Sequence, residues 1–265
     1  HMGRSTETIR YVIATWDEEH PTRALFPDRR RTFTPEQFQR IYDAYRAGRK
    51  LAELAGQFGC APSTIYRAIC QVRYEELRKR KPTFIAHPSF ESPDAEQKIL
   101  RTPIPAAPDG QAVSPPPPED ALPYLKDLWG AEVLSAEQEQ ALFRRYNFLK
   151  FLAARGIERI ESSGLLGGRQ LDRVETWLRW AEAVRDRLVR ANLRLVVSIA
   201  RKHHGPMTQL LDLISDGNMV LLRAIEKFDF ARGQKFSTYC SWAIMKHFAR
   251  SIPESNYQSR WAGAI

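Results

Sequence analysis

From Ala191 to Ile252 the chain reads ANLRLVVSIARKHHGPMTQLLDLISDGNMVLLRAIEKFDFARGQKFSTYCSWAIMKHFARSI. Apolar residues recur in this stretch at helical spacing, and no alternation of period two persists anywhere in the chain. On a helix that begins at Ser237, two sets of residues fall on different sides. One set is aromatic and basic: Tyr239, Trp242, Lys246 and Arg250. The other is apolar: Cys240, Ile244 and Phe248. The sequence therefore predicts an all-α protein whose last helix has one packing face and one open face.

Basic and aromatic side chains are interleaved between residues 230 and 250. Four basic residues and no acidic one lie there: Arg232, Lys235, Lys246 and Arg250. An aromatic stripe is core by default, but burying Lys246 and Arg250 without partners would be costly. The pattern is typical of single-stranded nucleic-acid binding, in which stacking contributes about 1–3 kcal/mol per base and cations follow the backbone. The aromatics in question are Phe236, Tyr239 and Trp242.

The same stretch closely resembles the second conserved region of sigma-70 factors, the bacterial transcription initiation factors. That pattern runs NLRLV, DLI-x-x-GN, L-x-x-A-x-x-KFD, G-x-KFSTY and W-x-I. Upstream, LPYLKDLWGAEVLSAEQEQALFRRY, from Leu122 to Tyr146, resembles the preceding family region, region 1.2. The resemblance implies a protein that binds RNA polymerase core and melts the minus-10 promoter element by capturing flipped bases of the non-template strand.

The resemblance also assigns roles to single residues. Trp242 matches the tryptophan at the edge of the melted region, and Tyr239 the aromatic that stacks a flipped adenine. Neighbouring melting residues are matched by Phe236 and Thr238, and phosphates would be held by Arg232 and Lys235. This chain departs from the family pattern at three positions: Gln234 for an aromatic, Ala243 for a second tryptophan, and Lys246 for a glutamine. We therefore expect altered melting or a non-consensus promoter.

A polar segment, Asp212 to Asn218, matches the family segment that docks on the coiled coil of the polymerase β′ subunit. The resemblance places docking on five residues: Asp212, Ser215, Asp216, Asn218 and Leu222. An acidic surface complementary to a basic partner helix would favour register and association rate. Its expected carboxylates are Asp212, Asp216, Glu226 and Asp229. Taken alone, the segment is equally compatible with a solvated helix face.

Residues 50–73 read KLAELAGQFGCAPSTIYRAICQVR and follow a helix-turn-helix pattern. Gly59 stands where the first helix must end in a left-handed turn, and Pro62 suits the first turn of the next helix. DNA contacts are expected on the second helix from Ser63, Thr64, Tyr66 and Arg67, with phosphates held by residues 78–81. The alternative is a small trihelical core that binds protein or nothing. The segment resembles both resolvase-type helix-turn-helices and the promoter-reading C-terminal domain of sigma factors.

Charge and proline content divide the chain. Of a net charge of +9 over 265 residues, residues 1–81 carry +6, 82–123 carry −4 and 190–265 carry +6. Eleven of the 17 prolines lie between 82 and 123, which predicts an extended, semi-rigid linker. The predicted organisation is a trihelical helix-turn-helix domain (1–81), a Pro-rich linker (82–121), sigma regions 1.2 and 2 (122–252) and a tail (253–265). Capping boxes at 34–37 and 135–138 mark two helix starts.

Several classes of protein find no support. The chain has no glycine-rich phosphate loop, no nucleophile with its base and no metal-ligand spacing, so we expect no enzyme, cofactor or metal site. Its three cysteines, Cys60, Cys70 and Cys240, are interpreted as buried thiols in a reducing cytoplasm. No apolar run approaches the roughly 18 residues that span a membrane.

The partners expected from the resemblance are RNA polymerase core, promoter DNA and an inhibitory anti-sigma factor. An alternative function is that of a non-catalytic adaptor, or a helix-turn-helix regulator, that lacks full promoter opening. Residues 253–265 are too few for the domains that follow in the family. Two interpretations stand: the chain is truncated there, or the N-terminal helix-turn-helix takes over the upstream DNA contact.

Overall fold

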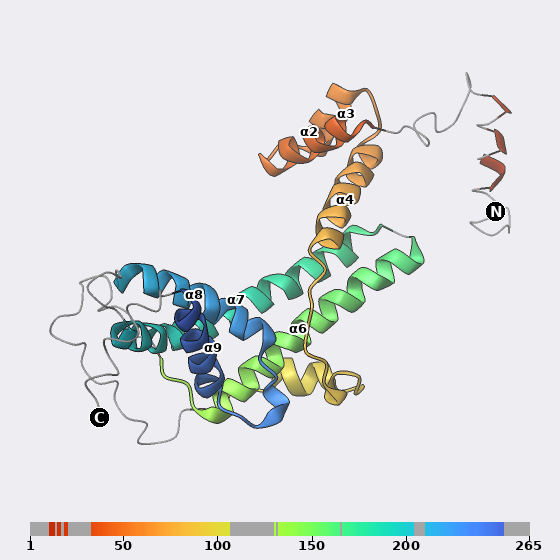
Figure 1. Cartoon of the computed structure of the whole chain (residues 1–265). Coiled ribbons are helices and arrows are strands. Elements are labelled where there is room, and N and C mark those ends of the chain that lie inside the picture. The colour runs from red at the N-terminus through yellow and green to blue at the C-terminus, as the bar shows by residue number, and fades with distance from the viewer. Residues whose placement is uncertain are drawn as a thin grey trace, which may run out of the picture. The chain divides into compact units, whose positions relative to one another are not determined.

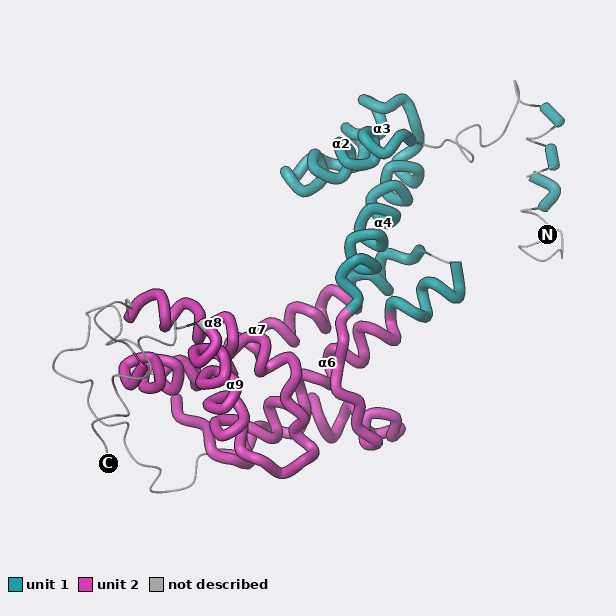
Figure 2. Tube along the Cα trace, in the orientation of Figure 1, with its two compact units in different colours: residues 1–81, 157–173 teal, residues 82–156, 174–265 magenta. Residues whose placement is uncertain are grey.

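The computed structural model describes residues 11–13, 15–16, 19–20, 33–106, 130, 132–164, 166–203 and 210–251. Every regular element in these ranges is helical, so the all-α prediction is confirmed for them. The chain divides into two compact units, each described below by itself (Figure 2). Unit 1 comprises residues 1–81 and 157–173, and unit 2 comprises residues 82–156 and 174–265.

Three helices of unit 1 pack around one hydrophobic cluster: α2 (Pro35–Arg46), α3 (Leu51–Phe58) and α4 (Pro62–Lys79) (Figure 1). The predicted capping box starts α2, because the Gln37 amide donates to Thr34 Oγ1 and the Thr34 amide donates back to Gln37 Oε1. Gly59 ends α3 in the left-handed conformation with φ 61°, as its position predicted. The buried cluster consists of Phe33, Ile41, Leu54, Ala55, Ile65, Ala68 and Ile69.

Unit 1 also holds the ends of two long helices. These are the last turns of α6 (Ala136–Ser163) and the first turns of α7 (Gly168–His203). We call residues 157–173 the α6–α7 tip. It packs with α4 inside unit 1, so this unit is larger than the predicted domain 1–81.

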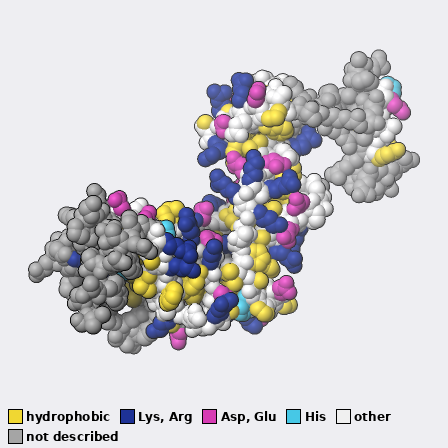
Figure 3. Space-filling view, in the orientation of Figure 1, with side chains coloured by type: hydrophobic (Ala, Val, Ile, Leu, Met, Phe, Trp, Pro, Cys, Tyr) yellow, Lys and Arg dark blue, Asp and Glu magenta, His cyan; other side chains and the backbone are white. Residues whose placement is uncertain are grey.

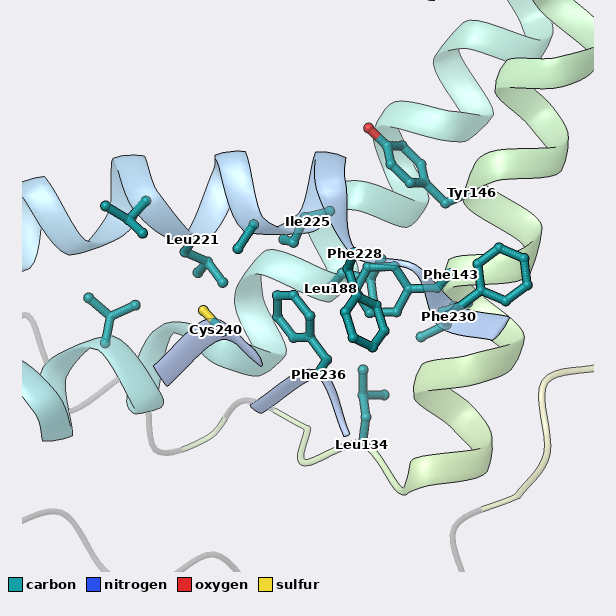
Figure 4. Close-up of a cluster of buried hydrophobic side chains, with 14 of the residues drawn as sticks. Leu134, Phe143, Tyr146, Leu188, Leu221, Ile225, Phe228, Phe230, Phe236 and Cys240 are labelled. Carbon is teal, nitrogen blue, oxygen red and sulfur yellow. The ribbon is translucent and has the colours of Figure 1, made fainter. Parts of the chain in front are cut away.

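Unit 2 is built from the remainder of α6 and α7 together with α8 (Leu210–Lys227) and α9 (Phe236–Ser251). The capping box of Ser135 and Gln138 precedes α6, as predicted. Four helices contribute to one core, shown in Figure 4. Its centre is aromatic, because the Phe143 ring centroid lies 4.7 Å from that of Phe228 and 4.9 Å from that of Phe236.

Residues 82–106 form a strap that packs on unit 2, and the structure corrects the predicted linker here. The strap contains two short helices, η3 (Pro88–Phe90) and η4 (Gln97–Arg101), and buries Phe90, Ala95 and Ile99 in the core of unit 2. A proline-rich composition predicted a spacer, but a few apolar side chains are enough to bind the strap to a helix. The rest of the predicted linker, 107–121, lies outside the described residues.

Polar side chains of α6 hold the strap at three points. The Ile85 amide donates to Asn147 Oδ1 at 2.8 Å, Arg145 Nε donates to the Ile99 carbonyl at 3.1 Å, and Gln138 Nε2 donates to the Pro105 carbonyl at 3.0 Å. Backbone groups of a segment without regular pairing need such partners when they leave water. The strap is therefore an integral part of unit 2.

Candidate functional site

Helix α9 has two faces of opposite character. Its core face is fully buried and repeats every four residues: Phe236, Cys240, Ile244 and Phe248. On the other face Trp242 is 68% exposed, and Lys246 and Arg250 are exposed with it. Tyr239 lies between the two faces, half-buried, with its ring centroid 5.6 Å from that of Phe228. The division agrees with the stripe predicted from the sequence.

A hollow of about 440 Å³ adjoins the exposed face of α9. It is lined by Gln234, Lys235, Thr238, Tyr239 and Trp242. Hydrophobic and basic side chains adjoin over this part of unit 2 in the space-filling view (Figure 3). The hollow thus brings together four of the predicted DNA-contacting residues and one, Gln234, that was singled out only as a departure from the family pattern.

Phe236 must be removed from the predicted DNA contacts. Its side chain is 0% exposed, and its ring packs on Phe143 and Phe228. The physical reason is spacing, because Phe236 lies four residues before Cys240 and so points to the same side of the helix. Phe236 can support the hollow from below, but it cannot reach a base in this conformation.

The start of α9 is fixed by a residue from a different helix. Glu139 of α6 accepts a hydrogen bond from the Phe236 amide at 3.3 Å, which satisfies one of the free amides of the first turn. Burial raises the pKa of Glu139, while this hydrogen bond and the nearby Lys235 oppose the shift. Glu139 also lines a second hollow with Gln234 and Lys235. No local pattern around Glu139 indicates this role, because its partner lies 97 positions away in the chain.

The loop before α9 is held by Asp229. Its Oδ1 accepts from the Ala231 amide at 3.1 Å and starts η6 (Phe230–Arg232). Its Oδ2 accepts from Arg232 Nε at 3.0 Å, while the Arg232 side chain stays 73% exposed. Arg232 and Lys235 are both exposed, and Lys235 lines the hollow.

Helix α8 presents the second predicted surface. Asp212, Ser215, Asp216 and Leu222 are exposed, and Asn218 is half-buried with a buried Oδ1 that has no hydrogen-bond partner among the described residues. Two large apolar side chains that were not predicted, Leu211 and Met219, are also exposed on this helix. At spacings of four and three residues, Leu211, Ser215, Met219 and Leu222 follow one stripe. This face combines apolar and acidic groups.

Two carboxylates expected on that acidic surface instead form contacts within unit 2. Glu226 pairs with Lys150 of α6 and accepts from the Tyr146 hydroxyl. Asp229 starts η6 and pairs with Arg232, as described above. Both partners of Glu226 come from a helix about 80 positions earlier, so the pattern around Glu226 could not reveal them. The acidic surface is therefore narrower than predicted and centres on Asp212 and Asp216.

Close packing explains the glycine of the α8 motif. Gly217 is buried, and a Cβ there would lie 2.6 Å from Val196 Cγ1 of α7 and 3.4 Å from Phe248 Cζ of α9. A side chain would push α8 away from both neighbours. Asp216 approaches α9 on the adjacent side, with its Oδ2 4.0 Å from His247 Nε2.

Two of the four residues predicted to contact DNA from the N-terminal helix-turn-helix are placed differently from the prediction. Ser63 and Arg67 are exposed on α4, but Thr64 is only 4% exposed. Thr64 lies four residues before Ala68, which belongs to the buried cluster, so the packing face of α4 is wider than predicted. Tyr66 is partly exposed, yet its hydroxyl lies against Gly168 of the α6–α7 tip, where a Cβ would be 1.6 Å away.

The remaining predictions concern thiols, metals and membranes. Cys70 and Cys240 are buried and Cys60 is half-buried, and none of the three forms a disulfide. Burial raises the pKa of Cys240 to about 12, so this thiol stays neutral in the core. Within the described ranges, no group of three potential ligands could hold a metal ion, and no helix is both long and apolar enough to cross a bilayer.

Residues 188–252 match the family model described as Sigma-70 region 2. The match begins in α7 and runs through α8 and α9, so it includes the α9 hollow and the outer face of α8. Unit 2 therefore contains a sigma-70 region 2 module, the class of module associated with transcription initiation and minus-10 recognition. Over these residues the chain is similar to members of the sigma-70 family.

Proposed function

We propose that this chain is a transcription initiation factor that binds RNA polymerase core and recognises and melts the minus-10 promoter element without catalysing a reaction itself. One observation carries the proposal. Helix α9 buries Phe236, Cys240, Ile244 and Phe248, and thereby holds Trp242, which is 68% exposed, at the edge of a hollow lined by basic and aromatic side chains.

The hollow suits a base that has left the duplex. Tyr239 and Trp242 offer rings for stacking, which contributes about 1–3 kcal/mol per base. Unstacking a base costs a few kcal/mol, so capture of one or two bases is enough to offset it. Lys235 adjoins the rings, and Lys246 and Arg250 extend the basic face along α9, where phosphates of the same strand would lie.

The outer face of α8 is the proposed surface for polymerase. An apolar stripe flanked by acidic groups matches the usual anatomy of a protein interface, an apolar centre with a polar rim. We assign the β′ coiled coil to this face, with Asp212, Ser215, Asp216, Asn218 and Leu222 in contact. Asp212 and Asp216 would guide a basic partner helix into register.

The three helices of unit 1 are proposed to bind duplex DNA as a helix-turn-helix. Gly59 provides the turn between α3 and α4, and Ser63 and Arg67 are exposed on the N-terminal half of α4. In this geometry the second helix enters the major groove with its N-terminal residues. Arg67→Ala should weaken duplex binding by the full chain and reduce the slope of log affinity against log salt by about 0.9 if one phosphate contact is lost.

The test of the initiation function uses two exposed tryptophans. Trp242→Ala should abolish promoter-specific transcripts from reconstituted polymerase and weaken binding of a single-stranded minus-10 oligonucleotide about 5- to 150-fold, the loss of one stacked base. Trp180→Ala is the matched control, because Trp180 is 53% exposed on α7 and does not line the hollow. Equal behaviour of the two variants would contradict the assignment of the hollow.

A non-catalytic adaptor is the second candidate, favoured by one observation. The exposed face of α9 carries Lys246, and the half-buried Ala243 occupies the place of a second tryptophan, so fewer rings are available for melting. An adaptor would bind core polymerase and lose this binding in Asp216→Lys, but would yield no promoter-specific transcript. Permanganate footprinting on a standard minus-10 sequence separates the two, because full opening by the wild-type chain would rule out the adaptor.

A further inference from the structure

Helix α4 has a second face that does not pack on α2 or α3. Four residues at spacings of four, three and four define it, namely Tyr66, Cys70, Arg73 and Leu77, and Lys81 follows just past the end of the helix. Cys70 and Leu77 are buried, although they are not part of the cluster shared with α2 and α3. Arg73 pairs with Asp172, Lys81 pairs with Glu158, and the Tyr66 hydroxyl lies against Gly168, all of them residues of the α6–α7 tip. The tip therefore packs against this side of α4.

Three ion pairs join the two elements. Arg73 Nη2 lies 2.5 Å from Asp172 Oδ1, Arg78 Nε lies 3.6 Å from Glu161 Oε1, and Lys81 Nζ lies 3.1 Å from Glu158 Oε1. The Arg73 side chain is only 13% exposed, whereas both members of the other two pairs are between 44% and 57% exposed. Basic and acidic side chains lie interleaved over this part of unit 1 (Figure 3).

These contacts use groups that a DNA-binding helix would offer to phosphates. Residues 78–81 are four consecutive cations at the C-terminal end of α4 and just past it. Two of them face carboxylates of the tip. Carboxylates and phosphates compete for the same cations, and exposed ion pairs are weak enough to exchange.

We propose that the tip is an internal competitor for DNA: Glu158, Glu161 and Asp172 occupy, in the free protein, positions on α4 that phosphates of a duplex take when the tip is displaced. The C-terminal half of α4 is thus a phosphate-backbone surface that is closed in the free chain. The inference rests on the proposed duplex binding by unit 1 and names the part of the chain that regulates it.

The experiment compares two triple variants of the full chain. Glu158→Gln, Glu161→Gln and Asp172→Asn remove the carboxylates of the tip. The control removes three carboxylates from ion pairs of unit 2, by Asp94→Asn, Glu132→Gln and Asp186→Asn. Both triples gain the same net charge, so only a local effect distinguishes them. Binding of a fluorescein-labelled duplex of mixed sequence is followed by anisotropy over a range of salt concentrations.

The tip triple should bind the duplex more tightly than the control triple, with a salt slope steeper by about 0.9 for each phosphate gained, or about 2.7 for three. Adding Arg78→Gln and Lys81→Gln to the tip triple should remove about two thirds of the increase in salt slope. Because the Arg73 side chain is only 13% exposed, the loss of its partner Asp172 is expected to lower stability as well. The double variant Glu158→Gln with Glu161→Gln retains that pair and should still steepen the slope by about 1.8.

Equal slopes and affinities for the double variant, the tip triple and the control would overturn the inference. If the wild-type chain then still loses duplex affinity with Arg67→Ala, the proposed function of unit 1 survives and only the competition fails. If neither the wild type nor the tip variants bind duplex DNA at low salt, both the DNA-binding role of unit 1 and the inference built on it are wrong.

Discussion

Lys150 of α6 and Glu226 of α8 form an ion pair within unit 2, with Nζ and Oε2 2.5 Å apart. The Lys150 side chain is 6% exposed and that of Glu226 is 41% exposed, so the cation depends on this carboxylate for a partner. The Tyr146 hydroxyl donates to the other oxygen of Glu226. Burial, and then this hydrogen bond, raise the pKa of Tyr146, which remains a donor. One carboxylate thus joins α6 to α8.

Glu226→Ala should lower the free energy of unfolding by about 2–3 kcal/mol, because it leaves a buried ammonium unpaired. The loss is below that of a fully buried pair since Glu226 is reached by water. Chemical denaturation measures this loss of stability. The control is Arg223→Ala, which removes an exposed charge from the same helix and should change the free energy of unfolding by no more than about 0.5 kcal/mol. Adding Lys150→Met should recover part of the loss. A double variant less stable than Glu226→Ala would show that the unpaired cation is not the cause.

Gly217→Ala should destabilise unit 2 by about 1–3 kcal/mol through overpacking against Val196 and Phe248. It should also weaken binding to polymerase core, because α8 carries the proposed docking face. Gly56→Ala is the matched control: Gly56 lies inside α3 with open space around its Cβ position, so the substitution should stabilise by up to about 1 kcal/mol. Thermal unfolding of both variants checks the prediction, and a neutral Gly217→Ala would contradict it.

Local patterns predicted the helices and the two faces of α9, because spacing along a helix decides which side chains share a side. The family resemblance assigned Phe236 to DNA, but Phe236 lies four residues before buried Cys240 and so falls on the packing side of the helix. The capping boxes and the turn at Gly59 were likewise predictable, since each depends on three or four neighbouring residues.

Contacts between distant residues account for what sequence analysis missed. Glu226 was expected on the partner surface because a carboxylate there would suit a basic partner helix, but its own partners lie 76 and 80 positions away in the chain. The strap was expected to be a spacer because it is rich in proline. Its fixing points, Asn147, Arg145 and Gln138, lie on a helix between 33 and 62 positions later. No pattern among neighbouring residues predicts contacts between residues so far apart in the chain.

Asn147→Ala should release one end of the strap. The buried Asn147 accepts from the Ile85 amide and donates to the Phe143 carbonyl within its own helix, so its loss should cost about 1–3 kcal/mol. Asn192→Ala provides the control, because Asn192 makes the same bond within α7, to the Leu188 carbonyl, and is also buried. Hydrogen exchange of the Ile85 amide should accelerate only in Asn147→Ala. Acceleration in both variants would mean that general destabilisation opens the strap.

The stability of unit 2 should depend on pH through Glu139. Burial raises the pKa of this carboxyl above its ordinary value of 4.5, so the folded protein retains the proton to a higher pH than the unfolded chain does. The free energy of unfolding then falls as the pH rises from about 4.5 through the raised pKa, and it levels off above it. Glu139→Gln keeps an acceptor for the Phe236 amide but cannot titrate. Its stability relative to the wild type should therefore increase with pH across this window.

Urea denaturation at a series of pH values between about 4 and 8 measures this difference, since the window opens near the ordinary pKa of a glutamate. Glu137→Gln, which removes an exposed carboxylate from the same first turn of α6, is the control for the loss of one negative charge. A Glu139→Gln curve parallel to that of the wild type would contradict the raised pKa. A different outcome is that Glu139→Gln is less stable than the wild type at every pH. The hydrogen bond that the Phe236 amide donates to the carboxylate would then stabilise the protein by more than burial of the charge destabilises it.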